Sequence, residues 1–166
     1  IQVMPNHTAN ELMYTFEEKN SKAKFKDLLD QYEDFKNDNT SSSKATEIST
    51  NAWHIIDWIF NEFPNIHLMN SIGDFRDALY PLCPSLKIMH DIANGSKHSK
   101  VSRPKASIKK TNKHIGPFSN IFSGQFDQTH LEIEMEDGTT LYFVDEIGLV
   151  IIFWKDYFRN TLNIND

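Results

Sequence analysis

The fold of this chain turns on residues 84–114, which read PSLKIMHDIANGSKHSKVSRPKASIKKTNKH. Proline is tolerated in the first turn of a helix, so Pro84 predicts the start of a short helix with one apolar side. Gly95 is placed to end that helix as a left-handed C-terminal cap. The chain then continues as a basic ribbon with no acidic residue before Asp127. This segment therefore separates a helical first half from a second part of different character.

Apolar residues recur at steps of three and four in four other segments, which predicts helices over residues 9–37, 45–63, 73–80 and 145–162. The first of these is rich in strong helix formers, with a kink expected near Asn20-Ser21. The polar run NDNTSSSK at 37–44 predicts a linker, after which Ser43 or Thr46 caps the second helix. Pro64 ends that second helix.

The strongest local pattern is HLEIEME at 130–136, where apolar and acidic residues alternate with the period of two that is typical of a strand. Asp137-Gly138 favours a tight turn, and TTLYFV at 139–144 supplies the β-branched and aromatic residues of a returning strand. SIKKT at 107–111 is a candidate third strand, because its basic residues would face the glutamates. A small antiparallel sheet is therefore predicted late in the chain.

These elements predict an α+β fold that is mainly α, an antiparallel helical bundle with a small late β-hairpin or three-stranded sheet. A length of 166 residues corresponds to about one domain. We expect a single domain over 1–166, with a flexible tail at 1–8 and a connecting region at 96–126 that is first basic and then aromatic. The last helix is strongly apolar and is expected to pack into the helical core or into a homodimer seam.

Several classes of protein leave no trace in the sequence. The single cysteine, Cys83, cannot form an internal disulfide, and there is no Gly-rich phosphate loop, Cys-based zinc spacing or nucleophile elbow. Residues 1–30 contain no apolar run of signal-peptide length, and IGLVIIFW at 147–154 is too short to span a bilayer. We therefore expect a cytoplasmic protein with no membrane contact, no cofactor and no bound metal.

The charge is distributed unevenly along the chain. There are 17 basic and 23 acidic residues, but seven of the basic residues and none of the acidic ones fall between Ile92 and Phe126. Clustered Lys and Arg bind polyanions because they release counterions from a phosphate backbone. Alternatively, the strip is a solvated loop that pairs with the acidic body of its own or another protomer. The first interpretation gives these polyanion-binding candidates: Lys100, Arg103, Lys105, Lys109, Lys110 and Lys113.

A second polar feature lies on the helix predicted over 45–63. His54, Asp57, Trp58 and Asn61 follow one another at helical steps, so their side chains share one face. This face predicts either a His-Asp pair at the edge of the core, covered by Trp58, or the supporting polar wall of a functional site.

Two short phrases, DIANGSKH at 91–98 and AWHIIDW at 52–58, resemble the HEPN superfamily and related uncharacterised bacterial and phage helical proteins. The resemblance implies an antiparallel helical bundle that often dimerises, with polar groups of both protomers meeting in a cleft. It also implies, for the ribonuclease members, an Arg and a His that cut RNA without a metal. The matching stretch here supplies Asp91, Asn94 and His98, and the Arg is missing.

Candidate catalytic residues follow from this resemblance, because such cleavage needs a base that titrates near neutral pH and a cation that stabilises the phosphorane. His98 is the candidate base and Lys97 the candidate cation. Asp91 would orient the protonated imidazole, with Asn94 beside it. Alternatively, Asn94 and His98 tie the end of the helix to the basic strip through backbone hydrogen bonds.

Three functional hypotheses result. The first is a HEPN-like intracellular module, non-catalytic or weakly catalytic, that binds RNA, another polyanion or a partner protein through the strip at 97–113. The second is a metal-independent endoribonuclease that uses His98 across a homodimer. The third uses His90-Asp91 with His54, which is similar to the HD phosphohydrolases, whose His and Asp side chains bind divalent cations.

Overall fold

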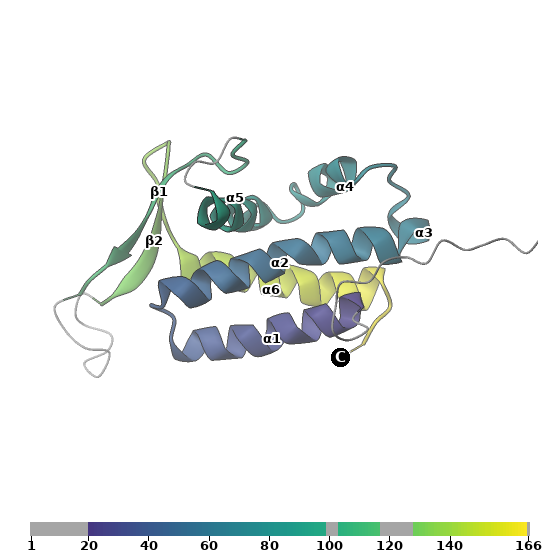
Figure 1. Cartoon of the computed structure of the whole chain (residues 1–166), viewed down its shortest axis with the longest axis horizontal. Helices are drawn as coiled ribbons and strands as arrows, with labels where there is room; N and C mark the ends of the chain where they lie inside the picture. Colours follow the sequence, from purple (N-terminus) through teal and green to yellow (C-terminus); the bar gives the residue numbers. More distant parts are fainter. Residues whose placement is uncertain (1–19, 99–102, 117–127, 166) are drawn as a thin grey trace, which may run out of the picture.

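The computed structural model describes residues 20–98, 103–116 and 128–165 (Figure 1). The helices are α1 (Ser21–Asn37), α2 (Ser42–Glu62), α3 (Pro64–His67), α4 (Ile72–Leu79), α5 (Ser85–Lys97) and α6 (Phe143–Asp156), followed by the π-helical turn η2 (Tyr157–Thr161). The strands are β1 (Ile108–His114), β2 (His130–Met135) and β3 (Thr140–Tyr142). The predicted α+β fold, mainly α, is confirmed.

The central helix of the bundle is α2. It packs against α1, α4, α5 and α6, and Figure 1 shows α1, α2 and α6 running side by side. Its predicted apolar stripe is the buried side, with Ile48, Ile56 and Ile59 almost completely shielded from solvent. Full burial of one such side chain contributes about 1.5–3 kcal/mol, so this stripe is a main source of bundle stability.

The start of α2 differs from the prediction. Ser41 is the N-cap, since its Oγ accepts a hydrogen bond from the Lys44 amide at 3.3 Å. The predicted caps, Ser43 and Thr46, lie inside the helix instead. In a run of serines the helix begins at the first hydroxyl that can satisfy a free amide of the first turn, and the predicted cap is therefore wrong by two residues or more.

The helix α1 begins where the kink was expected. Asn20 has an extended backbone, and its Oδ1 accepts a hydrogen bond from the Ala23 amide at 2.9 Å, which makes it the N-cap. The helix predicted over 9–37 is confirmed from Ser21 onward. Its first part, like the predicted tail at 1–8, lies outside the described residues.

The end of α5 also differs from the prediction. Gly95 lies inside the helix and does not cap it, because the helical hydrogen bonds continue until the His98 amide donates to the Asn94 carbonyl at 3.0 Å. Ser96 Oγ donates to the Ala93 carbonyl at 2.8 Å and supports this last turn. The chain leaves the helix at His98 in an extended conformation, so the left-handed cap predicted at Gly95 is wrong.

The strands form one antiparallel sheet in the order β1-β2-β3. The third strand predicted over 107–111 is confirmed and extends to His114. A register shift just before Lys110 brings two neighbouring lysines to one carboxylate: Lys109 Nζ lies 2.8 Å and Lys110 Nζ 3.2 Å from oxygens of Glu134. The expectation that basic residues of this strand face the glutamates of the next one is therefore confirmed.

The side chains of β2 alternate between two environments. Ile133 is 1% exposed and joins the hydrophobic core, with Leu131 and Met135 packed against that core. The alternate residues, His130, Glu132 and Glu134, project from the other face of the sheet because successive strand residues point to opposite sides. The strand β2 thus has an apolar face toward the helices and a polar outer face.

The strand β3 passes into α6 without a loop. Tyr142 is both the last residue of the strand and the N-cap of the helix, and Phe143 is the first helical residue. Asp145 and Glu146 lie in the first turn, as predicted, where their negative charge interacts favourably with the positive end of the helix dipole.

One side of α6 lies in the core of the molecule. Ile147 and Trp154 are 0% exposed, and Trp154 Nε1 donates a hydrogen bond to the Ala52 carbonyl of α2 at 2.9 Å. Packing of this helix into the core is therefore confirmed. Its opposite side leaves Leu149 and Ile152 exposed. In the part of the chain that the structure describes, no helix combines the length and the apolar character needed to cross a membrane.

The turn between β2 and β3 gives a testable prediction. Gly138 has φ +88°, a conformation that costs a residue with a Cβ about 1–2 kcal/mol, so Gly138→Ala should lower the free energy of unfolding by that amount. Gly73→Ala is the matched control, because Gly73 lies in α4 and an added Cβ would meet nothing closer than Ser71 Oγ at 3.7 Å. Urea denaturation should show a neutral or slightly stabilised control. Equal losses in both variants would contradict the prediction.

Candidate functional site

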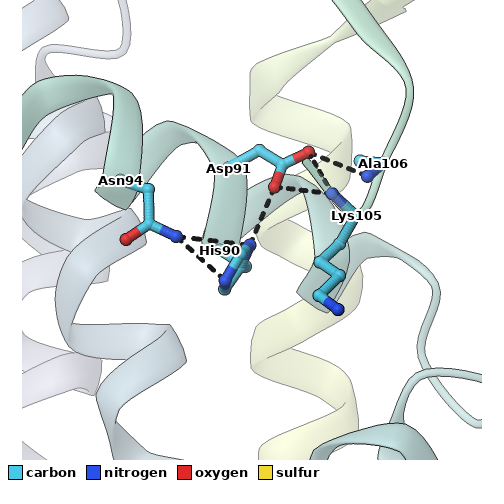
Figure 2. A network of polar contacts seen from close by, with 5 residues as sticks. All are labelled: His90, Asp91, Asn94, Lys105 and Ala106. Carbon is cyan, nitrogen blue, oxygen red and sulfur yellow. Dashed lines mark hydrogen bonds and ion pairs between the residues drawn. The ribbon is translucent and has the colours of Figure 1, made fainter. Parts of the chain in front are cut away.

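The carboxylate of Asp91 on α5 is the centre of a buried polar network (Figure 2). Both of its oxygens accept hydrogen bonds from the Lys105 amide, each at 2.9 Å, and Oδ2 also accepts one from the Ala106 amide at 2.8 Å. His90 Nδ1 lies 2.8 Å from Oδ1. The side chain therefore ties the backbone at 105–106 to the helix, and we call this set of groups, with Asn94, the Asp91 network.

His90 has a defined tautomer in this network. The carboxylate of Asp91 can only accept, so His90 Nδ1 carries the hydrogen. The other ring nitrogen, Nε2, then accepts a hydrogen bond from Asn94 Nδ2 at 2.9 Å. Asn94 is one helical turn further along α5, which places its amide beside the ring. Both imidazole nitrogens of His90 therefore have a hydrogen-bond partner, which indicates a structural role for this residue.

The environment keeps Asp91 charged. Burial alone raises the pKa of its carboxyl group, but hydrogen bonds from His90 and from the amides of Ala106 and Lys105 together outweigh that effect. The pKa therefore lies below its ordinary value. A charged group that accepts several hydrogen bonds is a strong anchor for the backbone that donates them.

The network continues through aromatic contacts to two other helices. The His90 ring meets Trp53 of α2 edge-on, with ring centroids 4.8 Å apart. The guanidinium of Arg76, on α4, lies 4.4 Å from the centre of the Trp53 ring and donates to Asp57 Oδ1 at 2.7 Å. This role of Arg76 could not be predicted from the sequence, since nothing in the order of residues indicates that α4 crosses α2 at this point.

The predicted catalytic residues are only partly brought together. Asp91 and Asn94 lie in one network, but the imidazole between them belongs to His90 and not to His98. His98 and Lys97 are exposed at the end of α5, and the His98 ring makes no hydrogen bond to any described residue. The backbone tie predicted between the helix end and the strip exists, but Asp91 provides it.

The polar face of α2 is likewise divided. Asp57 pairs with Arg76 and not with His54, while Asn61 Nδ2 donates to the Asp57 carbonyl at 2.7 Å. His54 is exposed. Partial desolvation lowers the pKa of its imidazole, Asp57 acts in the opposite direction, and the positive charges of Lys97 and Arg76 add to the lowering.

Trp58, predicted to cover a His-Asp pair, lies elsewhere. The Lys24 ammonium of α1 sits over its ring, 5.3 Å from the centroid. Trp58 and His54 line a cavity of about 180 Å³ between α1 and α2. This indole therefore contributes to helix packing rather than to a cover for Asp57.

The ligand set of the third hypothesis is not assembled. His90 uses both nitrogens within the Asp91 network, and His54 is exposed on another helix. Among the described residues, one group of side chains has ligand atoms close enough to share a metal ion, and it consists of His114, His130 and Glu132. This group was not predicted from the sequence.

The basic strip borders a cleft. Lys100 lies outside the described residues, while Arg103, Lys105 and Lys113 are exposed. A cleft of about 530 Å³ separates the end of α5 from β1, and we call it the α5–β1 cleft. Its lining residues include two lysines, three hydroxyl-bearing residues and one acid, which are Lys109, Lys110, Thr46, Ser96, Thr111 and Asp91.

The two lysines of the cleft are held by one acid. Hydrogen bonding to Glu134 raises the pKa of Lys109, and the same contact, with Lys110, lowers the pKa of Glu134. Both lysine side chains are exposed and the Glu134 side chain is 25% exposed, and ion pairs at such a surface contribute little to stability. The pairs can therefore open for another anion at little cost.

Comparison of the chain with protein-family models, with curated proteins and with solved structures finds no match. Function must therefore be argued from the geometry of these sites.

Proposed function

We propose that this chain is a HEPN-like helical module that binds RNA, with the phosphates of a single strand entering the α5–β1 cleft. The observation that carries the proposal is the cleft itself, because the neighbouring Lys109 and Lys110 line it together with the hydroxyl-bearing Thr46 and Thr111. Ammonium and hydroxyl groups are the usual partners of phosphate oxygens.

The Asp91 network supports this proposal by fixing the strip. Residues 103–107 have little regular structure of their own, but the amides of Lys105 and Ala106 are fastened to Asp91. The side chains of Arg103 and Lys105 are consequently presented beside the cleft from a held backbone. Ordering the strip before binding reduces the entropy that RNA binding would otherwise cost.

Glu134 is the built-in competitor for the cleft lysines. A phosphate that enters must displace its carboxylate from Lys109 and Lys110. Removing the negative charge while keeping the shape, as in Glu134→Gln, should therefore strengthen binding.

The proposal predicts how RNA affinity depends on these charges. Replacing Lys109 and Lys110 together by Ala should weaken binding of a labelled single-stranded RNA at least roughly tenfold at low salt and reduce the slope of log K against log[salt] by about 1.4, since each phosphate contact contributes about 0.7. Glu134→Gln should tighten binding. Fluorescence anisotropy over a salt series measures both effects.

The control removes the same charge elsewhere. Lys22 and Lys26 are exposed on α1, and their double replacement by Ala should change affinity much less. Equal losses in the two double variants would mean that net charge alone drives binding and would contradict the cleft. Binding of polyglutamate in place of RNA would assign the strip to an acidic protein surface and would overturn the proposal.

The same RNA assay tests the ribonuclease hypothesis. Cleavage that resists EDTA and disappears in His98→Ala would add catalysis to binding, whereas binding without cleavage is the result expected here, because His98 stands apart from the Asp91 network. The predicted homodimer belongs to the same proposal. The exposed Leu149 and Ile152 of α6 support it, and sedimentation of a variant with both replaced by Ser tests it.

A further inference from the structure

The polar outer face of the sheet carries a second cluster of functional side chains. The register of β1 and β2 places His114 directly opposite His130, and Glu132 follows two residues later on the same face. The ligand atoms of the three side chains all lie within 4.8 Å of one another. This cluster is separate from the Asp91 network and from the cleft lysines.

The two hydrogen-bond partners of His130 favour a positive charge beside its ring. Its Nδ1 lies 2.7 Å from the Gln128 carbonyl, and its Nε2 lies 2.7 Å from Glu132 Oε1. Both oxygens can only accept, but a neutral imidazole has one N–H to donate. With the hydrogen on Nδ1, the lone pair of Nε2 faces a carboxylate. A positive charge between these two atoms, either a proton or a metal ion, resolves the conflict.

His114 favours the metal ion. Its ring stacks on that of His130 with the centroids 4.7 Å apart and an angle of 25° between the planes. A proton on the His130 ring would need only the Glu132 carboxylate as its partner. The second imidazole, from His114, adds a further nitrogen ligand, and two nitrogens with one oxygen form a donor set that Zn²⁺ and neighbouring transition metals prefer. We propose that His114, His130 and Glu132 bind a divalent transition-metal ion such as Zn²⁺.

The spacing suits such an ion after small side-chain rotations. Ligands about 2.1 Å from a tetrahedral zinc are about 3.4 Å apart, so Glu132 moves slightly away from His130 while the two rings turn their nitrogens toward one point. The Gln128 carbonyl holds Nδ1–H, the arrangement that commonly fixes the orientation of a metal-binding His. Tyr142 packs edge-on against the His130 ring at 4.9 Å and limits its movement.

The site is partly sheltered and still reachable. The side chains of His130 and Glu132 are 28% and 24% exposed, and His130 also lines a cavity of about 220 Å³ with Asn39 and Thr129. Three protein ligands leave a fourth tetrahedral position for water or another small ligand. The site therefore has the open coordination of a binding or catalytic centre rather than the closed coordination of a structural zinc.

Calorimetric titration of the metal-free 166-residue chain with ZnCl₂ tests the proposal. One equivalent should bind, and His114→Ala, His130→Ala and Glu132→Gln should each weaken binding at least roughly tenfold, since each removes a direct ligand of the ion. His98→Ala, which removes an exposed His outside the cluster, should bind zinc like the unchanged protein. MgCl₂ should not bind, because Mg²⁺ prefers oxygen ligands.

A second measurement distinguishes the loss of a metal ligand from the misfolding of a variant. Saturating Zn²⁺ should raise the melting temperature of the unchanged protein by roughly 5–10 °C through its selective binding to the folded state, and Glu132→Gln, which is nearly isosteric, should lose most of that rise. The same affinity in all three ligand variants would overturn the site. No zinc binding by the unchanged protein would also overturn it.

Discussion

Trp154→Ala should lower the free energy of unfolding by about 3–5 kcal/mol, the usual cost of truncating a fully buried aromatic side chain. Trp154 is 0% exposed and packs between Tyr157 and Phe158, and its indole donates to the Ala52 carbonyl across the α6–α2 contact. The substitution removes a large apolar volume and the hydrogen bond together. Urea denaturation followed by circular dichroism gives the difference.

Two further variants separate these contributions. Trp154→Phe keeps a ring but removes the donor to Ala52, so it should lose less, with about 0.5–1.5 kcal/mol of the loss due to the hydrogen bond. Lys155→Ala is the control on the same helix, because the Lys155 side chain is exposed and its removal should change stability by no more than about 0.5 kcal/mol. A loss in Trp154→Ala no larger than in Lys155→Ala would show that α6 does not pack as described.

Asp91→Ala should lower the free energy of unfolding by about 2–4 kcal/mol, because it leaves the amides of Lys105 and Ala106 without their charged acceptor. Asn94→Ala is the comparison within the network. It removes only the contact to His90 and should cost about 1 kcal/mol. An equal effect of the two variants would contradict the central position given to the carboxylate.

The pH dependence of stability provides an independent test of Asp91. Its pKa is lower in the folded chain than in the unfolded chain, so its stabilisation is complete above the unfolded value of about 3.9 and is lost as the pH falls through the folded value. Between about pH 5 and pH 2 the unchanged protein should lose more stability than Asp91→Asn. Parallel curves would show that this carboxyl group has the same pKa in both states.

The helices and the hairpin were predictable because the signals that define them are local. Apolar spacing placed α2 and α6, and the alternation at 130–136 with Asp137-Gly138 placed the turn. Most errors fall at helix ends, and the short helix α3 was not predicted. At Gly95 the preference of glycine for a helix C-cap was outweighed by helical hydrogen bonds that continue to His98. No single residue type in the sequence indicates that the helix continues.

The imidazole of the Asp91 network shows why the site was harder to predict. His90 and His98 both lie four residues from Asn94, one before it and one after it, so the spacing alone favours neither. The helix decides, because it includes His90 and ends at Lys97, and only His90 keeps the geometry that helical spacing assumes. The amides at 105–106 come from a later segment, which spacing along the helix cannot reveal.

The cluster on the sheet depends on long-range pairing. The alternation in HLEIEME already places His130 and Glu132 on one face, but His114 joins them only through the register of β1 against β2. That register is set across a long connection and not by a tight turn. Sequence spacing could therefore suggest two ligands of the proposed metal site but not the third.

Because no loop separates Tyr142 from Phe143, the register of the hairpin and the rotation of α6 about its own axis cannot change independently. Each residue advances a helix by about 100°, so one residue added or removed at this junction would swing Trp154 and Ile147 out of the interior while the strand kept its place. The register of β3 in the hairpin therefore determines which side of α6 faces the core. An insertion or deletion in the turn at 136–139, before β3, leaves the junction between β3 and α6 unchanged. Changes of length are therefore tolerable only in that turn.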